Sequence, residues 1–155
     1  MLSFNSLMLN VGDKAPLFSL KNQNNELIIL KDILAEGNKV MLVVYPKDDT
    51  PGCTAQMCRV RDDYSEFAKF DIKIFGLNHG EASSHIKFIE KYNFPFDILI
   101  DENRKIIKEY GSTKMFFKNE TTQRSVFVID TDGKIIFAQK GQQDNSQILD
   151  LLKKQ

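Results

Sequence analysis

Cys53 and Cys58 are the residues whose types and spacing first suggest chemistry. They lie five positions apart in the segment YPKDDTPGCTAQMCRVRD, residues 45–62, where an apolar run gives way to a Pro/Gly turn and then to a helical pattern. Three roles are open for such a pair: buried packing residues, metal ligands or reactive thiols. Cys53 falls in the first turn of the predicted helix, where unpaired N–H groups and the positive end of the helix dipole favour an anion.

The five-residue spacing limits what the two sulfurs can do. In a continuous helix it gives a rise of ~7.5 Å and a rotation of ~140°. A disulfide needs Cα atoms within ~6.8 Å of each other and converging Cβ vectors. We therefore expect that Cys53 and Cys58 cannot bond while the helix is intact, and that a redox cycle at this pair would also be a conformational cycle.

A metal site is the weaker interpretation of the pair. A helix would present the two sulfurs to different sides, and the two histidines, His79 and His85, lack a paired spacing. We expect no metal and no cofactor. His85 is expected to be solvated at a helix start, with a local structural or pocket-edge role as the alternative. Arg59 and Arg61 are expected to be surface charges.

Apolar periodicity predicts an α/β protein with a mixed central sheet and helices on both faces. Continuous apolar runs predict buried strands, and spacings of three and four residues predict helices. Residues 111–123 show no clear period and are expected to form a loop that lines the site or a contact surface, with packing as the expected role of Phe116 and Phe117. The helix over 83–92 is expected to be capped by Ser83 or Ser84. The predicted strands are 39–46, 72–78 and 96–101; the hairpins are 20–30 and 124–140; the helices are 30–37, 54–67, 83–92, 104–111 and 146–154.

The whole chain has 155 residues, which favours one domain. Met8 is a second candidate start, so we expect residues 1–7 to be an extension and residues 8–155 to form the domain. Lys plus Arg and Asp plus Glu both number 21, which gives no electrostatic footprint for nucleic acid. We expect no membrane span and no secretory signal. Two cysteines without such a signal favour a reducing compartment, the cytoplasm.

Five residues taken together carry a resemblance to a known family. Pro46, Thr50 and Cys53 form a Pro-x-x-x-Thr-x-x-Cys motif, Cys58 follows five residues later, and Arg124 opens the segment RSVFVIDTDGKI. This combination resembles the peroxiredoxins, and most closely their bacterioferritin-comigratory (PrxQ-type) subgroup. The resemblance covers nearly the whole chain from residue 8 onward. It implies a thioredoxin-like fold, with a central mixed β-sheet flanked by helices on both faces and an N-terminal β-hairpin.

The resemblance also implies a role for each residue of the motif. Cys53 would be the peroxidatic cysteine that a hydroperoxide oxidises to a sulfenic acid, and Cys58 would resolve it as an intramolecular disulfide. Thr50 would offer its hydroxyl to the sulfur and the peroxide, Arg124 would donate to the reacting oxygens, and Pro46 would wall the pocket. The implied partners are hydrogen peroxide or small organic hydroperoxides and a dithiol reductant, thioredoxin or a similar protein. A resolving cysteine in the same chain favours a monomer, and the implied role is antioxidant defence.

Magnitudes show which of these residues matter most. A typical cysteine is roughly 3% thiolate at pH 7, so complete ionisation gains at most ~30-fold, whereas enzymes commonly gain ~10⁶-fold or more. The larger share must therefore come from orienting the O–O bond and stabilising charge on the leaving oxygen, which assigns heavy roles to Thr50 and Arg124.

Two other functions remain open beside the peroxidase. One is a redox relay that oxidises a partner protein, and the other is a thioredoxin-like binding module that kept its cysteines. The segment GLNHGEASSH departs from the subgroup, because relatives usually have Ser and Asp residues where Asn78, His79 and Gly80 stand. This departure predicts an altered pocket rim and leaves the proposed chemistry untouched.

Overall fold

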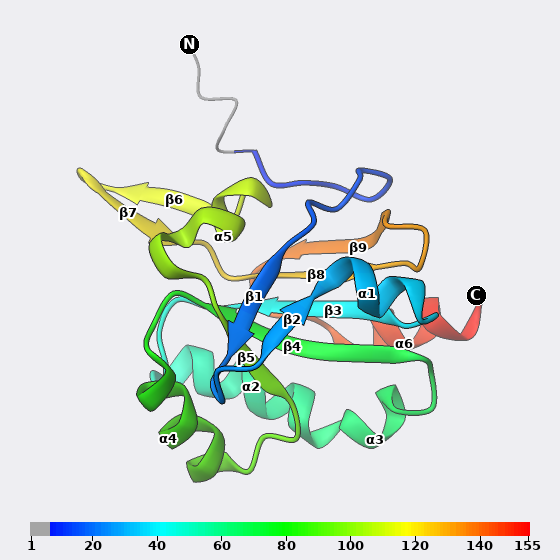
Figure 1. Cartoon of the computed structure of the whole chain (residues 1–155), viewed down its shortest axis with the longest axis horizontal. Coiled ribbons are helices and arrows are strands. Elements are labelled where there is room, and N and C mark those ends of the chain that lie inside the picture. The colour runs from blue at the N-terminus through cyan, green and yellow to red at the C-terminus, as the bar shows by residue number, and fades with distance from the viewer. Residues whose placement is uncertain (1–6) are drawn as a thin grey trace.

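A seven-stranded mixed sheet forms the centre of the protein, as a computed structural model describes it for residues 7–155 (Figure 1). Strands β3, β4 and β5 pair in parallel, and the pairs at either end of the sheet are antiparallel. The predicted α/β class and the N-terminal hairpin, β1–β2, are confirmed. In spatial order the strands are β2 (Leu27–Ile29), β1 (Ser19–Asn22), β5 (Asp97–Ile100), β4 (Ile72–Asn78), β3 (Lys39–Val44), β8 (Ser125–Ile129) and β9 (Ile135–Lys140).

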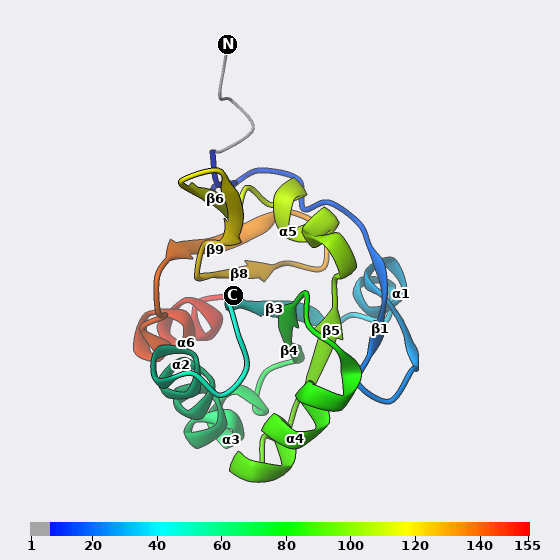
Figure 2. The same ribbon diagram turned by 90° about the vertical axis from the view of Figure 1, so that its left-hand side faces the viewer.

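Helices cover both faces of this sheet (Figure 2). Side chains alternate along a strand, so β3 divides its residues between two cores: Val40 and Leu42 face one, and Met41 and Val43 face the other. The first core is closed by α1 (Leu30–Ala35) and α5 (Lys105–Glu109), the second by α2 (Pro51–Asp62), α3 (Tyr64–Phe67), α4 (Ala82–Tyr92) and α6 (Asn145–Lys153). A 3₁₀ turn, η2 (Glu102–Arg104), precedes α5.

The site elements follow from the central strands. Residues 40–44 of β3 are all apolar and fully buried, as expected of a strand covered on both faces. Because β3 and β4 run in parallel, their carboxyl ends meet at one edge of the sheet. The loop after β3 leads directly into α2 at that edge, which is where open α/β sheets place their sites.

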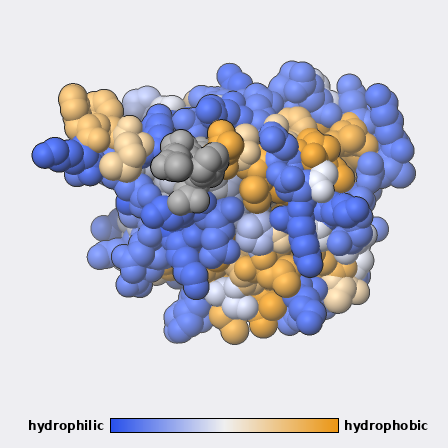
Figure 3. Space-filling model, turned by 90° about the horizontal axis from the view of Figure 1, so that it is seen from above, coloured by the Kyte–Doolittle hydropathy of each residue, from blue (hydrophilic) through white to orange (hydrophobic). Residues whose placement is uncertain are grey.

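Residues 111–123 form a hairpin, so the expectation of a loop was wrong. Strands β6 (Thr113–Phe116) and β7 (Asn119–Thr122) pair with each other and not with the main sheet. The expectation that Phe116 and Phe117 pack was also wrong, because they are 63% and 86% exposed. The apolar tip of the hairpin is not covered by other elements, and Figure 3 shows it projecting from one end of the molecule.

The start of α4 also differs from its prediction. Glu81, not Ser83 or Ser84, is the N-cap residue. The Ser84 hydroxyl instead donates to Asp48 in the loop after β3. Most of the expected N-terminal extension, residues 1–6, lies outside the described residues.

Candidate active site

Cys53 is the third residue of α2 and is almost completely buried, with 1% of its surface exposed. Pro51 occupies the first turn of the helix, where its missing N–H is no loss, and Thr50 stands at the N-cap with extended backbone. Cys53 packs in the same core as Met57 and Val60, four and seven positions further along the helix, and the three form an apolar stripe. The thiol therefore lies in a recess at the carboxyl edge of the sheet.

Cys58 lies on the same helix and is not bonded to Cys53; both are free thiols. The unbroken helix between them confirms the prediction from their spacing. Cys58 is partly buried, and this burial raises the pKa of its thiol, although the nearby charge of Arg61 opposes the shift. Its thiolate is therefore scarce while α2 is wound.

The Arg124 guanidinium lies against the first turn of α2, although Arg124 is 71 residues further along the chain than Cys53. A Cβ atom placed on Gly52 would lie 3.0 Å from Arg124 Nη2, so a larger residue at this position would press on the guanidinium. Arg124 Nη1 donates to Gln56 Oε1 at 2.9 Å. The arginine and the cysteine helix are thus brought together as the sequence predicted.

Gln56 is a site residue that the sequence reasoning missed. It is fully buried and orients Arg124 through the bond just described. The sequence contains a feature that could have revealed it, because Gln56 is a polar residue three positions after Cys53, on the side of the helix that carries the apolar stripe. Because Gln56 lies between the two cysteines, unwinding this part of α2 would also release Arg124.

Thr50 and Pro46 shape the loop between β3 and α2. The Thr50 hydroxyl donates to the Lys47 carbonyl at 3.0 Å. A hydroxyl has one proton, so donation to a peroxide would require this bond to break. Pro46 lines a cavity of about 550 Å³ together with Asn78, His79 and Arg104. The segment that departs from the subgroup therefore contributes to the cavity rim.

A buried hydrogen-bond network holds the same loop. Asp48 accepts from the Tyr45 hydroxyl at 2.6 Å and from the Ser84 hydroxyl at 2.7 Å, and His85 Nδ1 lies 2.6 Å from the same carboxylate. The expectation of a solvated His85 was wrong, because its side chain is 0% exposed. Burial disfavours the Asp48 carboxylate, but the bonds from His85, Tyr45 and Ser84 outweigh it and lower its pKa.

Arg104, Arg59 and Arg61 differ in their exposure and in their hydrogen-bond partners. Arg104 Nη2 lies 3.3 Å from His79 Nε2, and Arg104 Nε donates to the Thr122 hydroxyl. Burial, and then the charge of Arg104, lower the pKa of His79, so its ring is neutral at pH 7. Arg59 is exposed as predicted, while Arg61 is half-buried and donates to the Tyr92 carbonyl. Across residues 7–155, no group of three or more His, Cys, Asp or Glu side chains is placed to hold a metal ion.

Known proteins resemble this chain in sequence and in fold. Residues 11–138 match the AhpC/TSA family. Two relatives are a putative peroxiredoxin bcp of Coxiella burnetii, 36% identical over 83% of this chain and 87% of its own, and peroxiredoxin Bcp of Bacillus subtilis, 37% identical over 84% of both chains. The solved structure of peroxidoxin BcpB from Mycobacterium tuberculosis is 27% identical, with a TM-score of 0.84 over 93% of this chain and 96% of that one.

The chain belongs to the peroxiredoxins. Its relatives place it in the bacterioferritin-comigratory, or PrxQ-type, subgroup of the AhpC/TSA family, as the sequence resemblance predicted. Its fold is the thioredoxin fold of these proteins. As a peroxiredoxin it is a thiol-dependent peroxidase with a two-cysteine mechanism, and hence an oxidoreductase. No helix within residues 7–155 is long and apolar enough to span a membrane.

The Asp48 network predicts a pH-dependent contribution to stability. A carboxylate whose pKa is lower in the folded than in the unfolded state stabilises the fold above its unfolded pKa of ~3.9, and this contribution is lost as the pH falls through the folded value. We expect Asp48→Asn to lower the free energy of unfolding at pH 7 by about 1–3 kcal/mol. The gap from wild type should shrink below about pH 4.

Urea unfolding at pH 7 and at pH 3 measures this difference. Asp150→Asn, at an exposed position of α6, is the matched control and should leave stability nearly unchanged at both pH values. A gap for Asp48→Asn that stays constant down to pH 3 would contradict the assignment of a stabilising buried carboxylate.

Proposed function

We propose that this peroxiredoxin reduces hydrogen peroxide and small organic hydroperoxides with Cys53 as the peroxidatic and Cys58 as the resolving cysteine. The main support for this proposal is the position of the Arg124 guanidinium, which is held against the first turn of α2. This helix begins two residues before the buried Cys53. The Cys53 thiolate attacks the terminal peroxide oxygen, the O–O bond breaks, and water or an alcohol leaves after taking a proton. Cys53 is then a sulfenic acid.

The second step closes a disulfide. The Cys58 thiolate attacks the sulfur of the Cys53 sulfenic acid, the S–O bond breaks, and hydroxide leaves as water after taking a proton. An external dithiol then reduces the disulfide by thiol–disulfide exchange and is itself oxidised. Because Cys58 is partly buried on a helix that separates it from Cys53, this step needs α2 to unwind first.

The fixed donors at the site support the first step. Negative charge grows on the leaving oxygen as the O–O bond breaks, and donors already in place stabilise it without reorganisation. Arg124 provides such a donor, since its other guanidinium nitrogen is held by Gln56. Thr50 supplies a hydroxyl from the N-cap once its bond to the Lys47 carbonyl breaks. The Cys53 N–H helps to hold the peroxide, and Pro46 limits water at the wall of the pocket.

The proposed setting follows from the same features. A resolving cysteine in the same chain supports a monomer, and the redox pair supports thioredoxin or a similar dithiol protein as reductant. We place the enzyme in the cytoplasm as an antioxidant, because a reducing compartment suits a catalytic thiol pair. We also propose that residues 8–155 form the domain, since Met8 packs on the core and the Leu9 N–H donates to the Tyr110 carbonyl.

The cysteine roles predict distinct products after one equivalent of hydrogen peroxide. Intact-mass measurement should show that the wild type loses two hydrogen atoms as a monomer, because Cys53 and Cys58 form a disulfide. Cys58→Ser should gain one or more oxygen atoms instead, and Cys53→Ser should not react at this dose. Rapid oxidation of Cys53→Ser, with Cys58 as the modified residue, would reverse the two roles.

The position of Arg124 predicts a large kinetic effect. Arg124→Ala should lower the rate constant for reaction with hydrogen peroxide by about 10²–10³-fold, as removal of a preorganised donor typically does. Arg59→Ala, which removes an exposed arginine of α2, is the matched control and should change this rate little. Peroxide kinetics and iodoacetamide titration of the thiolate fraction should be measured together. A rate loss no larger than the loss of thiolate would contradict the proposed role in charge stabilisation.

The raised pKa of Cys58 predicts the pH dependence of the second step. The attacking species is the thiolate, so disulfide formation from preformed sulfenic acid should accelerate as the pH rises from 6 to 9. Rapid-quench alkylation followed by mass spectrometry measures this rate directly. A rate that is independent of pH over this range would mean that helix opening, and not ionisation of Cys58, limits the step.

A further inference from the structure

Helix α2 is held from the side by three side-chain amides. All three come from residues 141–145, a segment that we call the amide loop, and all three donate to backbone carbonyls of α2. The acceptors are four and three residues apart, so they lie along one face of the helix. The donor–acceptor pairs are Gln142 Nε2 to Gly52 O at 3.4 Å, Gln143 Nε2 to Gln56 O at 3.3 Å, and Asn145 Nδ2 to Arg59 O at 2.9 Å.

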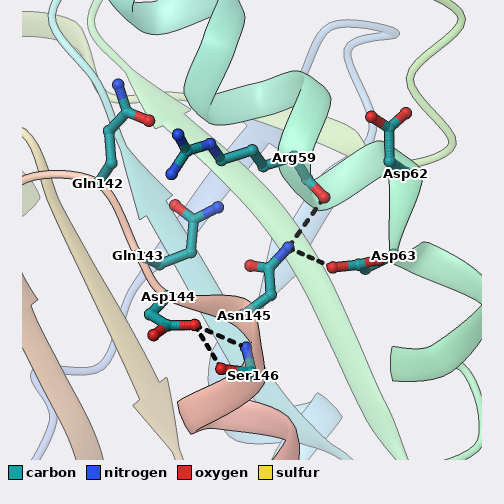
Figure 4. A pocket seen from close by; sticks show the side chains of 8 residues that line it. All are labelled: Arg59, Asp62, Asp63, Gln142, Gln143, Asp144, Asn145 and Ser146. Carbon is teal, nitrogen blue, oxygen red and sulfur yellow. Dashed lines mark hydrogen bonds between the residues drawn. The ribbon is translucent and has the colours of Figure 1, made fainter.

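The orientation of these amides is fixed by their partners. A backbone carbonyl can only accept, so each amide must turn its nitrogen toward the helix. Figure 4 shows the Asn145 nitrogen between two acceptors, the Arg59 carbonyl and the Asp63 carboxylate, both at 2.9 Å. The Arg59 carbonyl also accepts a hydrogen bond from the backbone N–H of Asp63. The hydrogen bond from Asn145 therefore adds to the backbone hydrogen bonds of the helix.

The amide loop is itself anchored to the strands that carry the rest of the site. The Gly141 N–H donates to the Arg124 carbonyl at 2.7 Å. Gln139 Nε2, on β9, donates to the Gln142 carbonyl at 2.7 Å. The loop therefore ties α2 to the backbone of Arg124, and the wound helix and the placed arginine are parts of one connected arrangement.

The three bonds are graded along the helix. The two at the Cys53 end are long, and the one beside Cys58 is short and doubled by Asp63. Longer hydrogen bonds are weaker, so the turn that carries Cys53 is the easier one to release. Unwinding from this end would break the bonds of Gln142 and Gln143 and leave the turn at Arg59 in place.

We propose that the amide loop sets how often α2 opens, and so sets the competition between disulfide formation and further oxidation of Cys53. Gln142 and Gln143 hold the first turns wound while a peroxide reacts. Asn145 confines the opening to the turns before Arg59, so that Cys53 moves toward a stationary Cys58. The consequence for oxidation rests on the proposed function; the control of helix opening does not.

Gln143→Leu tests this restraint of α2 by the amide loop, which we call the clamp. The substitution keeps the bulk of a buried side chain and removes the hydrogen-bond donor. Losing one such bond should raise the population of opened helix roughly fivefold. In the reduced protein, amide hydrogen exchange of residues 53–58 should accelerate by that factor while exchange in β3 stays unchanged. After one equivalent of hydrogen peroxide, the disulfide should form about fivefold faster, and excess peroxide should give correspondingly less sulfinic acid.

Two further variants sharpen the result. Asn145→Ala should extend fast exchange to residues 59–62, which the two glutamine variants should leave protected. Gln142→Ala, at a half-buried position, repeats the test of the first turn if Gln143→Leu does not fold. Gln147→Leu, exposed on α6 a few residues away, is the matched control and should change none of these rates.

The outcomes separate the two proposals. Unchanged exchange in residues 53–58, or an equal acceleration in β3, would overturn the clamp, because either one means that the amides do not act locally on α2. Failure of the wild type to form a sulfenic acid would overturn the proposed roles of the cysteines while leaving the exchange result to judge the clamp.

Discussion

The wound state of α2 is the constraint on which the rest of the site depends. The helix places Cys53 in its first turn and keeps it from Cys58, because five helical residues separate the sulfurs along and around the axis. The same turns carry Gln56, which holds Arg124. In the proposed mechanism, a single backbone conformation therefore supplies the reactive thiol and its fixed donor and, at the same time, keeps the two sulfurs from bonding.

The surrounding structure serves this constraint from three sides. The core beneath α2 buries its apolar stripe against β3. The network of Tyr45, Asp48 and His85 fixes the loop that leads into α2. The amide loop donates hydrogen bonds to backbone carbonyls along one side of α2. Only the core contributes strongly to global stability; the other two are polar contacts of modest individual strength, which suits elements that must release a helix during each turnover.

Much of the fold could be predicted from the sequence, because the central strands are buried on both faces and appear as continuous apolar runs. Strand β4 was predicted with its observed bounds, 72–78. The cysteine pair was equally visible from its type and spacing. The roles of Pro46, Thr50 and Arg124 came from the family resemblance and stay predictions. Polar residues that act through distant partners were not. His85 was expected in solvent because nothing local shows that Asp48, 37 residues earlier, receives it. The amides of residues 141–145 went unnoticed for the same reason, since their acceptors lie on a helix far away in the sequence. Phe116 and Phe117 were expected to pack, but their hairpin leaves them exposed.

We infer that α2 exchanges a wound, peroxide-ready state for an unwound, disulfide-bonded one. The most direct measurement compares backbone NMR chemical shifts of residues 51–62 in the reduced protein and in the disulfide form. The account predicts helical shifts throughout this range in the reduced form. In the oxidised form they should be lost between residues 52 and 58 and retained near residues 60–62. Helical shifts that persist across Cys53 and Cys58 in the disulfide form would contradict it.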